Sequence, residues 1–326
     1  MATVVGIDGG FATQLTQHIG DLVDGDPLWS ARFNLTNPEA VKVVHGDFME
    51  AGAKIIRTNT YQASVGGYKM YLGLSTEDSV KLIQSTVKLA HEARDDFMRK
   101  NAGAACPQIF GSIGPYGACL ADGSEYSGSY MGTTDHGTIR QWHNERIAII
   151  LEAGVDGLAI ETLPSAKEAE ILVNLMKENF ANVKFWISFQ CRNNAEIASG
   201  ENYHNTVKYL WQKVQEDEKL QKNFLAFGVN CSHPDNVASL FAGLNDPQVQ
   251  TDKTIPFVAY PNSGEIYDVV EKKWISDRSQ KPIENYIEEW ITLGARYVGG
   301  CCRNYASNIR RIRETLDTLR ETIGVN

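Results

Sequence analysis

The chain has 326 residues, of which 43% are hydrophobic and 22% charged. This composition is that of a folded globular protein and excludes a disordered or fibrous chain. The formal net charge is −9, from 31 basic and 40 acidic residues, and no block of Lys or Arg stands out. The sequence therefore argues against a nucleic-acid partner.

The N-terminal segment argues against export and membrane insertion. Residues 1–10 contain neither a basic start nor a long apolar run, so we expect no signal peptide. No stretch approaches the roughly 18 apolar residues of a membrane helix. We therefore expect a cytoplasmic protein without a membrane partner. Its six cysteines should then be thiols, metal ligands or catalytic groups rather than structural bridges.

Short apolar runs rich in Val, Ile, Phe and Ala recur along the chain and predict β-strands. Near-continuous apolar runs are typical of strands covered by helices on both faces. In chain order they are Val4–Ile7, Lys54–Thr58, Gln108–Ile113, Gly157–Ile160, Lys184–Phe189, Leu225–Val229, Ile255–Ala259 and Tyr297–Val298.

Helical patterns alternate with these runs. Apolar residues with helical spacing form two clear faces, Val80, Ile83, Val87 and Ala90 in one helix and Ile309, Ile312, Leu316 and Leu319 in another. Two helix starts are expected, one at Asn37-Pro38 and one at a capping box formed by Ser165 and Glu168. Glycines that end helices just before three of the strands are expected at Gly52, Gly154 and Gly294.

Eight strands that alternate with helices predict an α/β protein with a single (β/α)8 TIM-barrel domain spanning residues 1–326. An open doubly wound sheet is the alternative, but eight evenly distributed units favour closure. Several strand-to-helix connections are long and rich in Gly, Ser, Asn and Tyr. These are residues 9–37, 114–137, 191–203 and 261–282. Barrel enzymes carry their catalytic residues in such connections.

Three cysteines follow predicted strands directly and are candidate metal ligands. Cys231 follows the sixth strand, and Cys301 and Cys302 follow the eighth. The carboxyl ends of these strands open on one face of the barrel, so the sulfurs can converge. Zn2+ prefers thiolates, and a catalytic zinc site keeps one position open. Three buried cysteines and a vicinal 301–302 disulfide remain alternatives, because the spacing is not that of a CxxC pair.

Polar residues at other strand ends are candidate ligand contacts. Asp8 is followed by two glycines that allow a ligand to approach the backbone, although it can equally cap a helix. Glu161 needs a cationic partner, either a ligand ammonium or a nearby Lys or Arg. Asn59 is a candidate ligand contact or a turn residue. The aromatic run that begins at Tyr260 can hold a cation such as a sulfonium or simply pack its loop.

The ordered motifs together resemble those of the homocysteine S-methyltransferases, from about residue 4 to about residue 320. No G-x-G-x-x-G or P-loop pattern competes with this interpretation. The motifs are Asp8-Gly9-Gly10, Asp26-Pro27-Leu28-Trp29-Ser30-Ala31, Ala51-Gly52-Ala53, Thr58-Asn59-Thr60-Tyr61-Gln62-Ala63, Gly111-Ser112-Ile113-Gly114-Pro115, Glu161-Thr162, Gly228-Val229-Asn230-Cys231 and Gly299-Gly300-Cys301-Cys302-Arg303.

The resemblance implies a zinc barrel that methylates homocysteine to methionine. The zinc ligands of the family fall on three cysteines, Cys231, Cys301 and Cys302. Its acidic residues that hold the homocysteine amino group fall on Asp8 and Glu161. Further substrate contacts are expected at Asn59, Asn230 and Tyr260.

The donor and the assembly are implied by the same resemblance. The 260–265 run is similar to the branch that uses S-methylmethionine or S-adenosylmethionine rather than betaine. Asn304-Tyr305 and Gln14 depart from the usual Thr-Pro and Glu, which bears on donor preference rather than on the metal. The chain ends soon after the eighth helix, without the C-terminal arm of betaine-type oligomers or cobalamin modules. We therefore expect a monomer or a weak homo-oligomer.

The expected chemistry is activation of a thiol. A free alkyl thiol has a pKa of about 8.5, so little thiolate exists at neutral pH. Coordination to Zn2+ removes that proton, after which the sulfur can attack the methyl group of a sulfonium. Two other readings remain: an enzyme that acts on selenocysteine or another thiol, and a non-catalytic zinc-thiolate protein.

Overall fold

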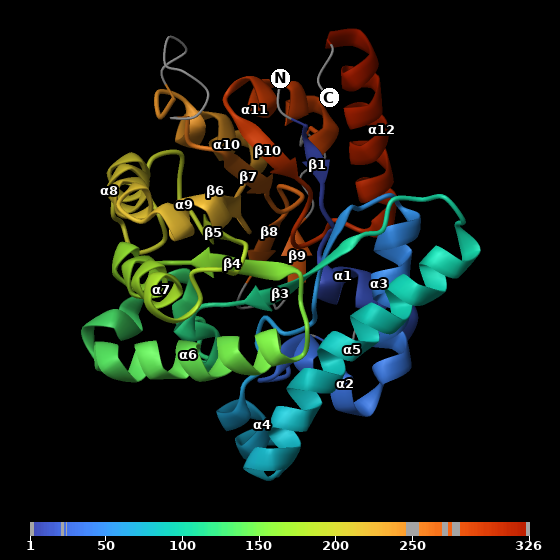
Figure 1. The fold of residues 1–326 in the computed structure, drawn as a ribbon, viewed down its shortest axis with the longest axis vertical. Coiled ribbons are helices and arrows are strands. Elements are labelled where there is room, and N and C mark those ends of the chain that lie inside the picture. Colours follow the sequence, from blue (N-terminus) through green and yellow to red (C-terminus); the bar gives the residue numbers. More distant parts are fainter. Residues whose placement is uncertain are drawn as a thin grey trace.

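A computed structural model describes residues 3–20, 23, 25–245, 254–268, 273–275 and 281–323. Its centre is one eight-stranded parallel sheet with helices around it (Figure 1). The strands are β1 (Val5–Gly6), β2 (Ile55–Arg57), β3 (Gln108–Ile113), β4 (Gly157–Leu163), β5 (Phe185–Phe189), β6 (Phe224–Asn230), β7 (Phe257–Tyr260) and β10 (Ala295–Val298). All eight predicted strands are present, with ends shifted by a few residues.

The sheet closes into a barrel. Its strand order is β1-β10-β7-β6-β5-β4-β3-β2, and the two outer strands of that order meet through a parallel bridge between Ile7 and Ile55. Beside this bridge the backbone N–H of Lys54 donates to the Gly6 carbonyl at 2.8 Å, and that of Asp8 donates to the Ile55 carbonyl at 3.1 Å. The predicted α/β barrel is therefore confirmed, and the open sheet is excluded.

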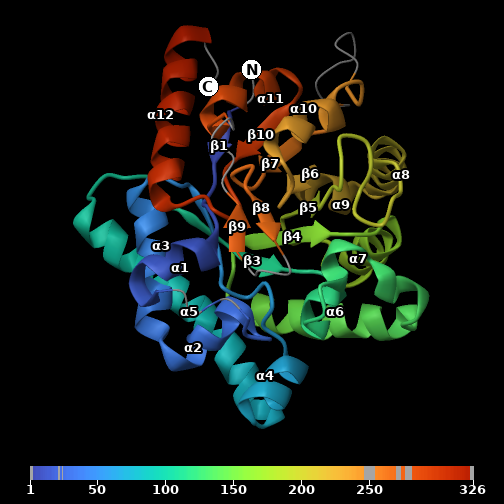
Figure 2. The ribbon, with the colours of Figure 1, turned by 180° about the vertical axis from the view of Figure 1, so that it is seen from behind.

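Helices surround the barrel on the outside, and α12 runs beside β1 and α3 (Figures 1 and 2). The helices are α1 (Phe11–Ile19), α2 (Phe33–Thr36), α3 (Pro38–Glu50), α4 (Val65–Leu72), α5 (Thr76–Lys100), α6 (His136–Glu152), α7 (Ala166–Asn179), α8 (Tyr203–Gln215), α9 (Glu218–Asn223), α10 (Pro234–Phe241), α11 (Ile287–Thr292) and α12 (Ala306–Ile323). The two predicted apolar faces lie on α5 and α12 and pack against the core. No helix in the described part of the chain is long and apolar enough to cross a membrane.

The predicted helix starts are confirmed at Asn37 and only partly at Ser165. The Asn37 side chain accepts from the Ala40 N–H at 3.3 Å, with Pro38 as the first helical residue. The Ser165 hydroxyl accepts from the Lys167 N–H at 3.1 Å. The predicted capping box does not form, because the Glu168 side chain turns into the core and accepts from the Tyr116 N–H at 2.7 Å instead.

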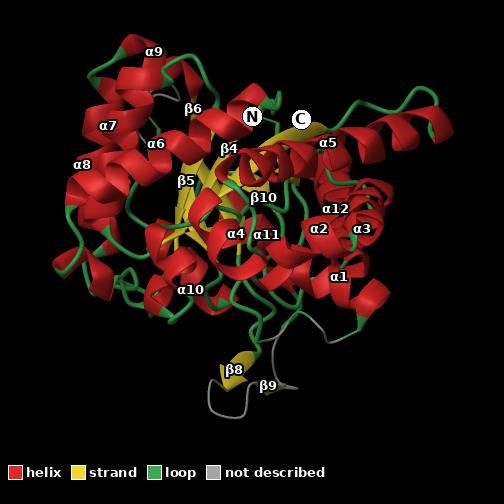
Figure 3. Ribbon diagram, turned by 90° about the horizontal axis from the view of Figure 1, so that it is seen from below, coloured by secondary structure: helices red, strands yellow, loops and turns green. Residues whose placement is uncertain are grey.

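The long connections after the strands contain structure of their own. The connection 9–37 contains α1 and α2. The connection 191–203 folds back on itself through antiparallel bridges between Cys191 and Ile197 and between Glu196 and Asn202. The connection 114–137 is built from 3-10 turns at Tyr116–Leu120, Ser124–Tyr126 and Ser129–Gly132. After β7 an antiparallel hairpin, β8 (Ile266–Asp268) with β9 (Lys273–Ile275), projects from the body of the molecule (Figure 3). Residues 269–272 and 276–280 of the predicted loop lie outside the described residues.

The barrel interior is apolar at mid-height and polar toward the carboxyl ends of the strands. The apolar layer consists of Ile7, Ile55, Phe110, Ala159, Trp186, Ala226, Val258 and Tyr260. Side chains two residues further along a strand point to the same side. This alternation places a second, polar layer inside the barrel, made of Arg57, Ser112, Glu161 and Ser188, all of them buried.

Candidate active site

A pocket lies over the polar layer, at the carboxyl ends of the strands. Its lining includes acidic and basic side chains, aromatic rings and three cysteines. They are Asp8, Arg57 and Glu161, then Phe11, Trp29, Tyr61 and Tyr126, then Cys231, Cys301 and Cys302. Ligands of barrel enzymes bind at this end. The arrangement therefore combines soft metal ligands, buried charge and aromatic faces in one place.

The three cysteine sulfurs converge as predicted. Cys231 follows β6, the Cys301–Cys302 pair follows β10, and β7 lies between those strands. The three Sγ atoms lie within 4.8 Å of one another. Zinc–sulfur bonds of about 2.3 Å in a tetrahedral site place neighbouring sulfurs roughly 3.8 Å apart, so this donor set fits Zn2+.

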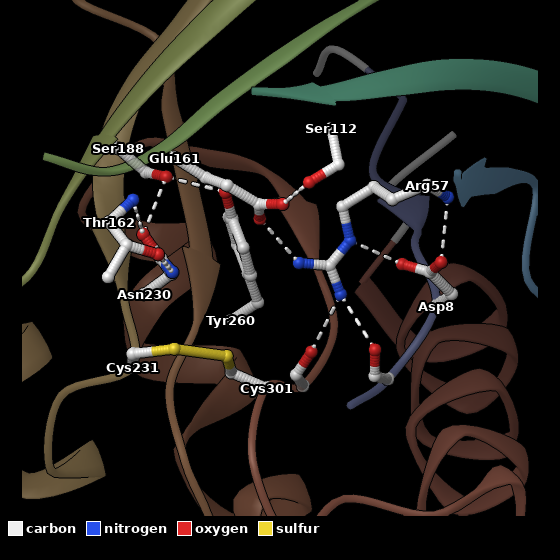
Figure 4. Close-up of polar contacts among 12 residues, drawn as sticks. Asp8, Arg57, Ser112, Glu161, Thr162, Ser188, Asn230, Cys231, Tyr260 and Cys301 are labelled. Atoms are coloured by element: carbon white, nitrogen blue, oxygen red, sulfur yellow. Dashed lines mark hydrogen bonds and ion pairs between the residues drawn. A yellow bond between two sulfur atoms is a disulfide. The ribbon is translucent and has the colours of Figure 1, made fainter. Parts of the chain in front are cut away.

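In this structure Cys231 and Cys301 are joined by a disulfide, with their Cα atoms 5.6 Å apart (Figure 4). The sequence predicted thiols or metal ligands rather than structural bridges, and the link between these two lies within the same three-sulfur cluster as the candidate metal site. The vicinal 301–302 disulfide is not the bond that forms. The reason is spatial, because the ends of β6 and β10, the two strands on either side of β7, bring residues that are 70 positions apart in sequence within bonding distance.

Arg57 links the two predicted acidic residues (Figure 4). Its Nε donates to Asp8 Oδ1 at 2.6 Å, and its Nη1 donates to Glu161 Oε2 at 2.8 Å. The Arg57 backbone N–H also donates to Asp8 Oδ2 at 2.7 Å. The sequence left two possible cationic partners for Glu161, a ligand ammonium or a nearby Lys or Arg. The structure shows that Arg57 is paired with it.

Burial and pairing act in opposite directions on Asp8. Its carboxyl is 1% exposed, and desolvation by burial raises its pKa to about 6, although the adjacent Arg57 charge lowers it. Burial disfavours the charged form of a carboxyl, and a neighbouring cation restores part of that loss. Asp8 is therefore ionised above about pH 6.

The other contacts of Arg57 keep its guanidinium in one place. Its Nη2 donates to the Gly9 carbonyl at 2.8 Å and to the Gly300 carbonyl at 3.0 Å. The guanidinium carbon lies 4.5 Å from the centre of the Tyr260 ring, a cation–π contact. The Tyr260 hydroxyl in turn accepts from Trp186 Nε1 at 3.0 Å and bonds the Ser188 hydroxyl. Tyr260 therefore lies beneath Arg57 with its hydroxyl already engaged.

Asn230 holds the backbone beside Glu161. Its Oδ1 accepts from the Thr162 N–H and from the Ser188 hydroxyl, both at 2.8 Å, and its Nδ2 donates to Thr162 Oγ1 at 2.7 Å. Thr162 has φ +62° and Cys231 has φ +48°. A residue with a branched Cβ rarely adopts this left-handed region, and such strain collects at functional sites. Asn230 thus stabilises the strained turn that directs Glu161.

Asn59 is buried in the pocket wall. Its Nδ2 donates to the Ser30 carbonyl at 2.9 Å and to Asn34 Oδ1 at 2.8 Å, and its Oδ1 accepts from the Ser30 hydroxyl at 2.7 Å. These bonds tie the end of β2 to the 28–36 segment. The substrate contacts predicted for Asn59, Asn230 and Tyr260 stay predictions, since the bonds of these residues are to other parts of the chain.

Aromatic side chains line the pocket beside the cysteines. Trp29 and Tyr61 meet edge to face, with ring centres 6.4 Å apart. Phe11 and Tyr126 belong to the same lining, and Trp29 has φ +47°. Aromatic faces attract cations through their quadrupole. This part of the pocket suits a positively charged group.

The sequence interpretation missed the polar layer as a set. Arg57, Ser112 and Ser188 each stand two residues after an apolar residue of the barrel interior, so the period of two in a strand would have found them. Ser112 donates to Glu161 Oε1, which completes the pairing of that carboxylate. The fourth residue missed, Thr162, carried no comparable signal because its role depends on a turn.

The fold and the site together define a barrel with a cluster of three cysteines beside a pocket that contains buried charged side chains. A family model described as homocysteine S-methyltransferase matches residues 5–316. The chain belongs to the homocysteine S-methyltransferase family, a family of methyltransferases, and the predicted membership is confirmed.

Relatives and solved structures agree over nearly the whole chain. A Drosophila melanogaster protein named betaine-homocysteine S-methyltransferase is 46% identical over 95% of this chain and 93% of its own length. Homocysteine S-methyltransferase 1 of Brassica oleracea is 40% identical over 95% and 92%. The metallated form of the homocysteine methyltransferase MmuM from Escherichia coli is similar with a TM-score of 0.79, at 31% identity over 95% and 96%.

Proposed function

We propose that this chain transfers a methyl group from a sulfonium donor, S-methylmethionine or S-adenosylmethionine, to the thiol of homocysteine and gives methionine. The observation that carries the proposal is the convergence of three cysteine Sγ atoms within 4.8 Å in a pocket that also contains Asp8 and Glu161. Family membership supplies the reaction class.

Cys231, Cys301 and Cys302 would hold Zn2+ once all three are thiolates, which requires the 231–301 disulfide to be reduced. When bound there, Zn2+ supplies a Lewis acid that lowers the pKa of a coordinating acceptor thiol. Three thiolates around a divalent ion leave an excess of negative charge, which favours a nucleophilic acceptor sulfur. No side chain is then needed as a general base for the thiol.

The acidic pair would position the acceptor. Asp8 and Glu161 are buried, and their carboxylate oxygens can accept hydrogen bonds from the homocysteine ammonium group. Anchoring the ammonium fixes the direction in which the thiol side chain extends toward the cysteines. Holding a reactant in a productive orientation removes part of the entropic barrier.

The aromatic lining would receive the cationic donor. Trp29, Tyr61 and Tyr126 present rings to the pocket, and each ring face attracts a sulfonium. In the transfer, the acceptor sulfur forms a bond to the methyl carbon. The bond from that carbon to the donor sulfur breaks, its electron pair stays on the donor, and a neutral thioether leaves. The loss of the positive charge weakens the contact with the rings and favours release.

Three alternative functions differ from this proposal, in the donor, in the acceptor or in whether the protein is catalytic. Betaine is a second candidate donor, because its quaternary ammonium suits the same rings and the 46% identical relative is named for it. Selenocysteine or another thiol is a second candidate acceptor. A non-catalytic zinc-thiolate protein would need the cysteines but not the acidic pair.

The test replaces Cys302 by Ala and measures bound zinc and methyl transfer in reduced protein. We expect the variant to lose zinc and activity, whereas the exposed Cys106→Ala control retains both. A panel of S-methylmethionine, S-adenosylmethionine and betaine against homocysteine and selenocysteine then assigns donor and acceptor. Full activity of the Cys302→Ala protein without zinc would refute the metal-dependent mechanism. Unchanged homocysteine affinity in Asp8→Asn and Glu161→Gln would favour the non-catalytic reading.

A further inference from the structure

We propose that Arg57 is a positioning residue that fixes the charge and the direction of the carboxylates which bind the acceptor ammonium, and so makes the pocket selective for an acceptor with one ammonium group. This inference rests on the proposed function. It concerns a residue that touches the acidic pair rather than the reacting sulfur.

Arg57 connects the two carboxylates across the barrel. Asp8, at the end of β1, and Glu161, in β4, come from strands separated in the barrel by β2 and β3, and Arg57 at the end of β2 contacts both (Figure 4). Its backbone N–H and Nε hold both oxygens of Asp8, whereas Nη1 holds one oxygen of Glu161. Ser112 holds the other Glu161 oxygen. Each carboxylate is therefore fixed at two points.

The two carboxylates keep lone-pair positions for a ligand. A carboxylate offers about four lone-pair positions on its two oxygens. Hydrogen bonds from Arg57 and Ser112 place one donor on each of the four oxygens of the pair. An ammonium with three N–H donors can thus be added without breaking any bond already present.

Arg57 also sets the net charge of the acidic pair. The two carboxylates and the one guanidinium that they share sum to a formal charge of −1, which one ammonium neutralises. Among the described residues that line the pocket, Arg57 is the single Lys or Arg. Without it, two carboxylates would face one ammonium and leave a buried charge unpaired, which is costly.

The Arg57 side chain is itself held rigidly. Arg57 is 7% exposed, and its Nη2 is held by the Gly9 and Gly300 carbonyls while its face rests on Tyr260. A guanidinium is planar with donors in a fixed fork, so it transmits this fixed position to both acids. A lysine at the same place would bring one charge but could not make all these contacts.

The experiment compares Arg57→Lys and Arg57→Gln with the native residue, using reduced, zinc-loaded protein. Calorimetry gives the Kd for homocysteine and for 4-sulfanylbutanoate, the same thiol acid without its ammonium group. Transfer from S-methylmethionine gives kcat and KM. Bound zinc and the unfolding temperature report on the metal site and the fold. Arg140→Gln, which breaks a partly exposed pair with Glu178 on the outer helices, is the matched control.

We expect Arg57→Lys to fold, to bind zinc and to weaken homocysteine binding about tenfold, with KM rising more than kcat falls, because hydrogen bonds to charged groups are lost. Binding of 4-sulfanylbutanoate should change less than about threefold, since that ligand makes no ammonium contact. Arg57→Gln should also weaken homocysteine binding more than 4-sulfanylbutanoate binding, and its loss of homocysteine affinity should be larger than that of Arg57→Lys. If this variant does not fold, Arg57→Lys carries the test by itself.

The outcomes separate this inference from the proposed function. An equal loss for both ligands, or unchanged homocysteine binding in Arg57→Lys, would overturn the positioning role while leaving the transferase intact. If the native protein binds homocysteine no better than 4-sulfanylbutanoate, the ammonium site itself is wrong and the inference falls with it. The absence of any methyl transfer by the native protein would instead refute the proposed function.

Discussion

Asn230 provides the sharpest test of how the site is held together. Its side chain makes three hydrogen bonds, to the Thr162 N–H, the Thr162 hydroxyl and the Ser188 hydroxyl. Replacing Asn230 by Ala removes all three. It leaves the Thr162 N–H without an acceptor, while Ser188 keeps its bond to the Tyr260 hydroxyl.

The size of the effect follows from these contacts. A buried donor left without a partner costs about 1–3 kcal/mol. The other two hydrogen bonds, to the Thr162 and Ser188 hydroxyls, contribute about 0.5–1.5 kcal/mol each. We therefore expect Asn230→Ala to lower the free energy of unfolding by about 3 kcal/mol, and to do so without any substrate present.

Urea unfolding of reduced, zinc-free protein measures this loss, followed by tryptophan fluorescence and by circular dichroism. Coincidence of the two transitions justifies a two-state free energy. Asn179→Ala is the control, because Asn179 bonds Asn144 on the exposed surface and should change stability by less than about 0.5 kcal/mol. In a Thr162→Gly background the Asn230→Ala loss should shrink by about 1 kcal/mol, because glycine lacks the hydroxyl that accepts from Asn230 Nδ2 and one of the three bonds is already absent. A substrate-free stability equal to that of the native protein would refute the reasoning and favour a pure substrate contact.

Two further predictions concern pH. Burial raises the pKa of Asp8 to about 6, so homocysteine affinity should fall as pH drops through about 6. This particular fall should be absent in Asp8→Asn. The same pH dependence in both proteins would contradict the assignment. The folded state holds the Asp8 proton more tightly than the unfolded chain, so this group contributes stability below pH 4 that is lost as pH rises through about 6. His45 is buried, finds no hydrogen-bond partner among the described residues, and has its pKa lowered by burial to about 3. The contribution of neutral His45 to the free energy of unfolding is therefore complete above pH 6.5 and is lost as pH falls toward 3, by about 3 kcal/mol at pH 4. In unfolding experiments His45→Phe should lack this acid-induced loss of stability. An equal loss in the variant would show that another group is responsible.

The barrel and the position of its site could be predicted from the sequence because both are local patterns. Apolar runs of strand length, helical periodicity and the Asn37 cap act within a few residues, and together they determine which segments become strands and helices. Cys231 and the 301–302 pair were recognised because each directly follows such a strand. Closure then places those strand ends on one face.

The partners of the charged groups were decided only by the tertiary structure. Arg57 meets Asp8 across 49 residues and Glu161 across 104, and Asn230 meets Thr162 across 68. These contacts depend on the register of neighbouring strands, such as Phe110 beside Gly157, and on closure between Ile7 and Ile55. Glu168 shows the same limit, since its spacing from Ser165 suited a cap while burial turned it toward Tyr116. A local sequence pattern indicates which buried side chains need a partner. The strand register and the closure of the barrel determine which partner each of them contacts.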